Sequence, residues 1–557
     1  MIATVGLIFF LTLDIRQAPD PGNVLPSDTI ALLKWKNIDP PFQRFQATPF
    51  GKKILAPRFW KKMGLGGVCE DARQKVLDII DSIQAIAPHV SFSILSRKMA
   101  AVAILSPEQP CQSLPDCLEH SLVFCTAIQR PAKQQGDQLR FRGTDRHIET
   151  MYGIEVHMVP VEGGRKVYFA LIDDLMLGSL QRGLLLRCLN AYSAHLVQPS
   201  RTLAGNSGYV KLLQHASRDE VCSLYLNPFF IKQIGQAVGF RAMQRGTFFG
   251  PETRLLLQYH EKADRRYLTF VSTGIPDNKV SFLNKYFPAK PLVHQRLERL
   301  DSRVSGYLWT NWFDVEKLWQ GLSDISDMET AASLFYIEQA VLRRTGMRME
   351  TLMALLDNEL GVFIADFPTA AFASLPVICL QLKVKDKRAV RRLLRKILAD
   401  VPMRSRVVGG TPAISLVLAN GLIEPTYLFY DEYLIVADNA ELIEYWMGTC
   451  RKKLVDSMAF KKVSHGLRQA NNLIFYTRSD QVNSGLEKML QLLTYTLQGA
   501  DRISPEQGAF IRNELLQPLF NSVQNVRSQS IRVVQQQNVL LGAISFYVPG
   551  PGQGEEK

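Results

Sequence analysis

Hydrophobic and polar positions form the same short pattern at two distant places in the chain. Val167–Leu177 reads VYFALIDDLML, and Thr426–Val436 reads TYLFYDEYLIV. In each stretch two apolar, β-prone runs flank a pair of acidic residues. Asp favours tight turns because its side chain hydrogen-bonds nearby backbone amides. Both stretches therefore predict a β-hairpin, with Asp173–Asp174 and Asp431–Glu432 at the turns.

The other predicted elements repeat in the same order. Helical spacing of apolar residues predicts helices over Asp71–Ile86 and Met328–Arg343. A Ser or Asn that can cap a helix opens both Asn206–Lys211 and Asp456–Lys461. The sequence therefore predicts an α+β fold built by tandem duplication, each copy an antiparallel β-sheet packed by helices on one face. Chance recurrence of ordinary α+β patterning is the alternative.

The predicted domains follow from this repeat. The first copy covers 25–273, a proline-containing linker covers 274–303, and the second copy covers 304–548. The second copy contains an additional helical hairpin near 480–523, which either caps the domain or carries a partner site. A flexible tail follows over 549–557.

The N-terminal residues 1–24 form an apolar run and a tether. The run MIATVGLIFFLTL is shorter than the about 20 residues that span a bilayer. It is typical of a truncated signal peptide or membrane anchor, although a basic leading region is missing. A buried first strand is the alternative.

Composition narrows the class of protein. Hydrophobic residues make up 46% and charged residues 21%, which is ordinary for a folded chain and excludes global disorder. The formal net charge of +13 favours anionic surfaces. The basic residues are spread along the chain, which argues against nucleic acid as the partner.

The sequence contains no motif that predicts catalysis, a cofactor or a metal. GxxxxGK[ST], HExxH, GxSxG and CxxC are all missing. The acidic pairs at the two hairpin turns are interpreted as structural, because exposed carboxylates lack the burial that shifts a pKa. We therefore predict no catalytic, cofactor-binding or metal-binding residues.

Two cysteines are candidates for a disulfide. Cys111 and Cys117 bracket the short loop CQSLPDC. Four cysteines within apolar runs are interpreted as buried small hydrophobic residues, namely Cys125, Cys188, Cys222 and Cys379. The redox compartment stays undecided.

The helix predicted over Asp386–Leu398 is the most distinctive surface feature. One side carries apolar residues at helical spacing, namely Val390, Leu393, Leu394 and Ile397. The opposite flank carries the candidate residues for binding an anionic surface: Arg388, Arg391, Arg392 and Arg395. Such a stripe suits anionic lipid headgroups or an acidic partner, whereas a solvated helix face is the plainer interpretation.

Short motifs resemble a family of exported bacterial proteins of unknown function. Leu25, Pro26, Asp28 and Thr29 match its Leu-Pro-x-Asp-Thr strand, and Thr48–Lys52 matches its Thr-Pro-x-Gly-Lys step. Asp456–Val463 is similar to another element of that family. The resemblance implies a duplicated α+β fold and a place in the bacterial cell envelope, on the periplasmic side, and it brings no catalytic residues.

Three functions are compatible with these patterns. We favour a non-enzymatic binding or scaffold role in the envelope, with an anionic membrane surface or an envelope protein as partner and anchoring through the N-terminal segment. A carrier of lipid or another apolar ligand is the first alternative. A hydrolase whose site residues meet only in the fold is the second.

Overall fold

The structure is a computed structural model of the 557-residue chain. The described residues are 20–36, 52, 99–106, 121–127, 147–160, 166–195, 197–217, 219–228, 252–262, 265–274, 287, 290–312, 314–317, 319–320, 328–365, 377–421, 423–447, 452–479, 513, 526–536 and 539–549. The apolar run at the N-terminus, Cys111, Cys117 and, apart from Asn513, the expected helical hairpin near 480–523 lie outside them.

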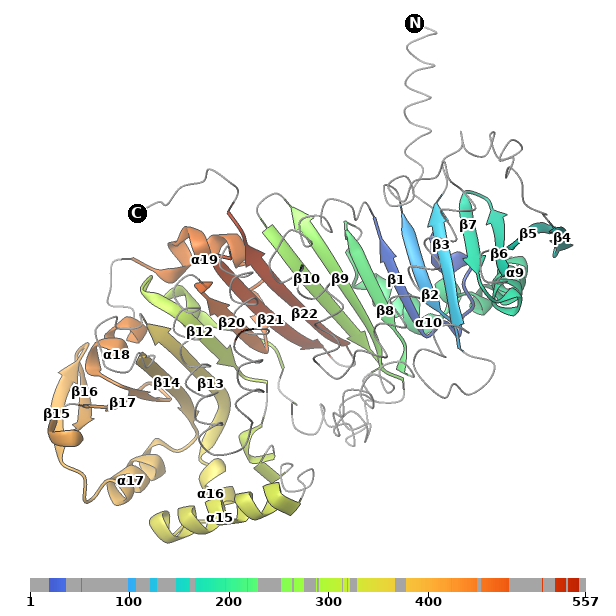
Figure 1. Ribbon diagram of the computed structural model, residues 1–557. Helices are drawn as coiled ribbons and strands as arrows, with labels where there is room; N and C mark the ends of the chain where they lie inside the picture. Colours follow the sequence, from blue (N-terminus) through green and yellow to red (C-terminus); the bar gives the residue numbers. More distant parts are fainter. Residues whose placement is uncertain are drawn as a thin grey trace, which may run out of the picture. The chain divides into compact units, whose positions relative to one another are not determined.

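The chain divides into two compact units. Unit 1 contains Met1–Gln233 and Arg254–Tyr259, and unit 2 contains Ile234–Thr253 and His260–Lys557. Each unit is built on an antiparallel sheet with helices against it, so the chain is a mixed α/β protein whose sheet is mostly antiparallel (Figure 1).

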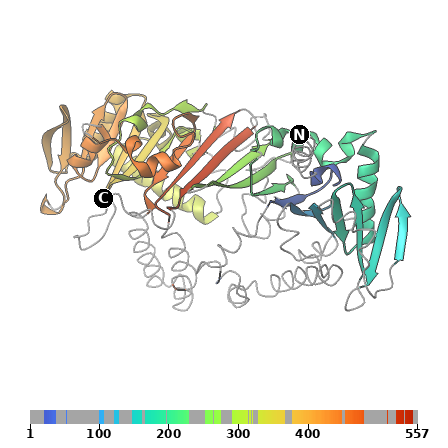
Figure 2. The same ribbon diagram turned by 90° about the horizontal axis from the view of Figure 1, so that it is seen from above.

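The sheet of unit 1 runs in the order β9, β8, β1, β2, β3, β7, β6, β5, β4. Figure 2 shows the last two strands, in cyan, at one edge. The strands are β1 Ala31–Trp35, β2 Ala100–Ile104, β3 Leu122–Ala127, β4 His147–Met151, β5 Ile154–Pro160, β6 Lys166–Ile172, β7 Leu175–Ser179, β8 Cys222–Leu226 and β9 Arg254–Lys262. The unit 1 part of β9 ends at Tyr259.

The helices of unit 1 bury their apolar sides. In α9, Arg182–His195, the buried residues include Leu185, Cys188 and Leu189. The other helices are α10, Ser207–Gln214, and the 3-10 helices η1 Pro21–Asn23, η4 Pro199–Arg201 and η5 Leu203–Gly205. Tyr209 of α10 meets Tyr225 of β8 edge to face, with ring centroids 5.0 Å apart.

The sheet of unit 2 runs in the order β10, β22, β21, β20, β12, β13, β14, β18, β17, β16, β15. The strands are β10 Arg265–Thr273, β12 Val304–Thr310, β13 Leu356–Ala365, β14 Val377–Val384, β15 Met403–Val408, β16 Thr411–Leu416, β17 Thr426–Tyr430, β18 Tyr433–Ala437, β20 Leu473–Thr477, β21 Ser528–Gln536 and β22 Val539–Tyr547. A separate two-stranded ribbon pairs β11, Leu292–Val293, with β19, Ala470–Asn471.

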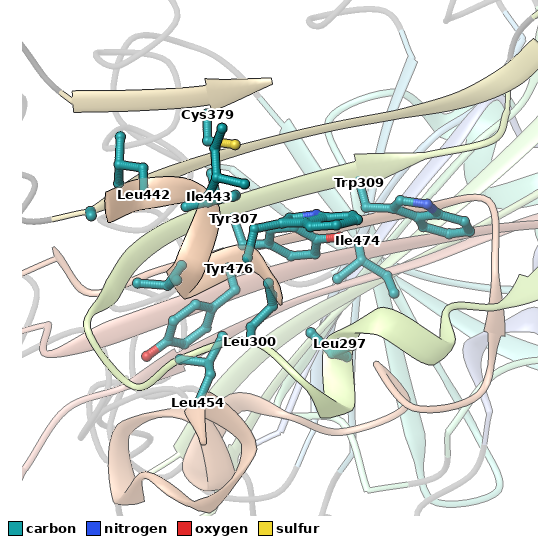
Figure 3. Close-up of a cluster of buried hydrophobic side chains, with 14 of the residues drawn as sticks. Leu297, Leu300, Tyr307, Trp309, Cys379, Leu442, Ile443, Leu454, Ile474 and Tyr476 are labelled. Atoms are coloured by element: carbon teal, nitrogen blue, oxygen red, sulfur yellow. The ribbon is translucent and has the colours of Figure 1, made fainter. Parts of the chain in front are cut away.

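Helices pack against both faces of the unit 2 sheet. On one face, α18 (Ala440–Met447) contributes Leu442 and Ile443 to a core (Figure 3). This core also includes Trp446 of α18, Leu428 and Ile435. On the other face, α17 (Lys387–Ile397) contributes Val390 to a second core with Tyr427. Because residues alternate sides along a strand, Tyr427 and Leu428 point to opposite faces. The expectation of helices on one face is therefore wrong for unit 2.

Five further helices complete the description of unit 2. They are α15 Met328–Thr345, α16 Met349–Met353, α19 Met458–Val463, and the 3-10 helices η6 Gln295–Glu298 and η8 Leu454–Asp456, with a kinked turn η7 at Ala419–Gly421. Leu297 and Leu300 anchor the segment around η6 in the first core, where Leu454 of η8 also lies (Figure 3).

Both predicted hairpins are confirmed. Ile172 pairs with Leu175, and Tyr430 pairs with Tyr433, so each turn consists of the two acidic residues alone. The first residue of each turn is left-handed, with φ of 52° at Asp173 and 50° at Asp431. Asp tolerates this conformation better than most residues because its short polar side chain bonds locally.

Candidate functional site

Helix α17 forms where the sequence predicts it. The Asp386 carboxylate caps its N-terminus by accepting hydrogen bonds from the Arg388 and Ala389 amides, each at 2.9 Å. The Ala389 amide has the largest effect on the pKa of Asp386, which these bonds and the charges on Arg392 and Arg388 lower below its ordinary value. The cap therefore stays ionised, which suits the positive end of the helix dipole.

The apolar side of α17 fixes the helix to the sheet. Val390 and Leu393 are buried, and Leu394 packs against the same cluster as Tyr427 and Phe429 of β17. With this side occupied, the basic residues have to face outward.

All four arginines of the candidate surface are exposed. Arg388, Arg391 and Arg395 recur at the spacing of one helix face, and Arg392 flanks them. The Arg391 guanidinium lies 5.0 Å from the centre of the Phe429 ring, which holds its stem against the sheet. From 383 to 399 the chain carries a single acidic residue, Asp386. Its basic residues there are Lys383, Lys385, Lys387, Arg388, Arg391, Arg392, Arg395 and Lys396.

Helix α15, which contacts α17, carries large exposed apolar side chains. Phe335, Tyr336 and Ile337 are 57%, 70% and 47% exposed, and Leu342 is 38% exposed. Consecutive exposed residues of this size are unusual on a soluble helix, and exposed apolar patches mark interaction sites. The sequence predicted this helix but gave no sign that its large side chains would remain in solvent.

Helices α15 and α17 contact each other at the end of α15 (Figure 1). The Lys396 ammonium donates to the Thr345 carbonyl oxygen at 2.8 Å. A lysine at this position satisfies one of the carbonyls that a helix C-terminus leaves free. This contact joins the two helices near their C-terminal ends, and we call their exposed side chains together the α15–α17 surface.

A polar cluster missed by the sequence analysis lies beside the start of α17. The Lys383 ammonium donates to Glu359 at 2.8 Å and lies 3.6 Å from Asp357 and 3.7 Å from Glu432. The Tyr433 hydroxyl donates to the other oxygen of Glu359 at 2.8 Å. Partial burial lowers the pKa of Lys383, but the Glu359 hydrogen bond and the three negative charges raise it more, so the net shift is upward. Lys383 therefore stays protonated, and its positive charge is balanced by carboxylates of the protein itself. It does not belong to the outward basic surface.

The acidic turn of unit 2 has a structural partner. Asp431 accepts a 2.6 Å hydrogen bond from Arg296, whose guanidinium carbon lies 4.6 to 5.7 Å from the ring centres of Tyr430, Tyr433 and Trp446. In unit 1 the Asp173 carboxylate accepts a 2.9 Å hydrogen bond from Tyr192. Both turns hold neighbouring elements in place, as expected from their structural interpretation.

A chain of hydrogen bonds lies in the first core of unit 2. The Trp446 indole donates to Gln381, whose amide donates to the Tyr307 hydroxyl at 3.4 Å, and Tyr307 bonds to Nε2 of His294. All four side chains are buried. Burial, and then the charge of Arg296, lowers the pKa of His294 to about 3, so its ring is neutral and shares one proton with the Tyr307 hydroxyl. These hydrogen bonds therefore have a structural role inside the core.

Other classes of site are not indicated by the described residues. Within them, no group of three or more His, Cys, Asp or Glu residues is placed to hold a metal ion. Among the helices of the described ranges, none has the length and apolar content needed to cross a membrane. Cys125, Cys188 and Cys379 are buried free thiols, as predicted, whereas Cys222, for which burial was also predicted, is a half-buried free thiol at the start of its strand.

Comparisons with known proteins identify no family. No family model and no curated protein matches the chain. Two crystal forms of the protein TP0453, forms III and I, are similar to it at 10% sequence identity, and the match covers 50% of this chain and 90% or 89% of that one. The TM-score is 0.22 in both cases, which is too low to carry an argument about fold or function.

Proposed function

We propose that this protein is a non-enzymatic binding protein that associates with an anionic membrane surface through the α15–α17 surface. The observation that carries the proposal is the contact between an outward-facing arginine helix and a helix with exposed aromatic residues. Helices that lie in a membrane interface combine these two properties, with basic residues near the headgroups and aromatic or aliphatic residues at the acyl boundary.

The expected strength of membrane binding follows from the number of basic residues on the α15–α17 surface. Each basic residue near an anionic bilayer contributes about 1 kcal/mol, so the four arginines together contribute about 4 kcal/mol. Apolar burial of Phe335 and Tyr336 adds to this, because anchoring by one type of contact alone is weak. Binding of this kind is reversible and weakens as salt rises.

The test is flotation of the full chain with liposomes. Vesicles of phosphatidylcholine with phosphatidylglycerol are compared with vesicles of phosphatidylcholine alone, at low and high salt. We expect flotation only with the anionic vesicles. Replacing Arg388, Arg391, Arg392 and Arg395 with Gln should weaken binding by up to about a thousandfold, which is the same 4 kcal/mol.

A matched variant tests whether binding depends on the location of the basic residues or only on the net charge of the protein. Lys166, Lys211, Arg265 and Lys461 are exposed basic residues that do not belong to α17, and their replacement with Gln removes the same charge. This control should keep most of the binding. Equal loss in both variants, or flotation that ignores the anionic lipid, would reject the α15–α17 surface as the membrane contact.

We also propose that the chain arose by tandem duplication. The order β9, β8, β1, β2, β3, β7, β6, β5, β4 of unit 1 corresponds strand for strand to β21, β20, β12, β13, β14, β18, β17, β16, β15 of unit 2. In both, a 3-10 helix leads directly into a helix with a side-chain cap, at Asn206 and at Ser457. An experimental structure in which these strands do not superpose would reject the proposal.

Location in the bacterial envelope is the third part of the proposal. It is supported by the apolar run and tether in residues 1–24 and by the family resemblance. Fusing these residues to alkaline phosphatase, which is active only after export, tests it. Activity inside an intact envelope supports export, and an inactive, soluble fusion contradicts it.

A further inference from the structure

Strand β15 is an edge of the unit 2 sheet (Figure 1). Among the described strands its one neighbour is β16, with which Met403 to Val408 pair in continuous register. Val408 is buried in the first core and anchors the strand, whereas Met403 is 46% and Val407 is 73% exposed. An exposed edge of this length is a template for another strand unless something blocks it.

The register shows which backbone groups are free to bind a strand. Val408 pairs with Thr411 across the two-residue turn Gly409–Gly410, so this pair is of the hydrogen-bonded kind. Hydrogen-bonded pairs alternate with non-bonded ones, so Arg404 and Arg406 also bond to β16. The amide and carbonyl groups of Met403, Ser405 and Val407 therefore point away from the sheet. They offer donors and acceptors to an incoming strand.

The side chains on this edge carry unbalanced positive charge. Arg404 lies 3.2 Å from Glu424, and Arg406 contacts the other oxygen of the same carboxylate. Two guanidinium groups thus share one carboxylate. In the part of the chain that the structure describes, Nε of Arg406 has no hydrogen-bond partner although it is buried. The Arg404 side chain is 60% exposed and can therefore bind another carboxylate.

The same arginines oppose pairing of β15 with a second copy of itself. Two antiparallel copies of β15 can be related by a two-fold axis at residue 404, 405 or 406. Only these three registers let at least two outward-pointing residues of each strand form hydrogen bonds with the other strand. These arrangements place Arg404 opposite Arg404, Arg404 opposite Arg406, or Arg406 opposite Arg406. Like charges directly opposite each other destabilise a strand pair. Residues with carboxylates at the same positions stabilise it.

We propose that β15 binds an extended acidic segment of a partner protein as an added antiparallel strand. The backbone of Met403, Ser405 and Val407 forms the hydrogen bonds. Carboxylates two residues apart on the partner face Arg404 and Arg406, because such residues lie on one side of a strand. This mode gives affinity through the main chain and selectivity through the side chains. The site is separate from α17, so the proposal does not depend on membrane binding.

The test is fluorescence anisotropy of labelled peptides with the full chain. The probe is Gly-Thr-Val-Glu-Thr-Glu-Thr-Val-Gly, and its control replaces both Glu residues with Lys. We expect the acidic peptide to bind at least about tenfold more tightly, a difference of about 1.4 kcal/mol. Equal binding of the two peptides, or binding of neither, would overturn the proposal.

Two variants show whether β15 is the site. Ser405→Pro removes an outward amide that β16 does not use, and it should abolish binding, whereas Ser405→Ala should bind normally. Arg404→Glu should reverse the preference toward the Lys peptide, which a merely misfolded variant would not do. If the chain instead forms a dimer in sedimentation that Ser405→Pro dissolves, the occupant is a second copy and the proposal is wrong.

Discussion

The Tyr307 hydroxyl and Nε2 of His294 are hydrogen-bonded inside the first core of unit 2, joining the segment before η6 to strand β12. The His294 ring also stacks on Trp309, with centroids 4.4 Å apart. A buried histidine in this position is a neutral structural group.

Replacing Tyr307 with Phe should destabilise the protein. The change leaves Nε2 of His294 without its hydrogen-bond partner and the Gln381 amide without its acceptor, and a buried polar group left unpaired costs about 1–3 kcal/mol. Urea unfolding of full-length protein measures the loss. Tyr336→Phe is the control, since that residue is 70% exposed and its variant should unfold like the parent. Equal stability of Tyr307→Phe and the parent would show that the hydrogen-bond chain contributes nothing.

Stability should fall in acid because of His294. Its folded pKa is lowered to about 3, against an ordinary 6.5, so the unfolded chain binds a proton more readily between these values. Above about pH 6.5 the protonation of His294 therefore does not reduce the free energy of unfolding. Below pH 6.5 the free energy of unfolding falls by up to about 1.4 kcal/mol for each pH unit, until about pH 3.

The measurement compares the parent with His294→Asn in urea titrations at pH 7.5 and pH 5, followed by tryptophan fluorescence. Asn cannot titrate, so the variant should lose less stability between the two pH values. Identical pH dependence of the two proteins would contradict the assignment of a buried neutral histidine.

Gly361 should tolerate no side chain. A Cβ at this position would lie 1.9 Å from Nε2 of Gln381, so Gly361→Ala should displace the amide that links Trp446 to Tyr307. We expect a loss of about 1–3 kcal/mol from the broken hydrogen bonds. Gly306→Ala is the matched control on the neighbouring strand, because its nearest contact would be an ordinary 3.6 Å to Ile364. Similar unfolding midpoints for both variants would contradict the expected close fit.

The stability of the turn at Asp431 should depend on the left-handed backbone conformation of this residue more than on its charge. Asp431→Asn keeps a residue that accepts positive φ, and the exposed ion pair with Arg296 contributes less than about 1 kcal/mol. Asp431→Val should cost about 1–2 kcal/mol more, because a β-branched residue fits the left-handed region poorly. Thermal unfolding distinguishes the variants, and a Val variant as stable as the Asn variant would rule out this account.

The apolar part of the α15–α17 surface should matter for membranes and not for folding. Phe335→Ser with Tyr336→Ser removes two exposed rings, so the unfolding midpoint should not change. Membrane binding should weaken by at least about tenfold, since burying one such side chain contributes about 1.5–3 kcal/mol. Val197→Ser with Tyr152→Ser, at residues 84% and 56% exposed, is the control and should bind like the parent. Normal binding by the α15 double variant would exclude α15 from the membrane contact.

Local features of this protein could be determined from the sequence alone. The turns at Asp173 and Asp431, the caps at Asn206 and Ser457, and the arginine stripe of α17 depend on residues close in the chain. Their signals are the conformational preferences and side-chain spacing of neighbouring residues, which need no tertiary information.

Tertiary structure decided which distant residues meet. Lys383 and Glu359 lie on neighbouring strands, and His294 reaches Tyr307 and, through it, Gln381, so no sequence spacing marks these groups as partners. The packing of α17 against the face of the sheet opposite to α18 also could not be predicted. Each strand there is apolar on both sides, and alternation in sequence then no longer tells which face a helix covers. The basic stripe was visible in the sequence, but only the fold brought its helix into contact with the end of α15, the helix that carries the exposed rings.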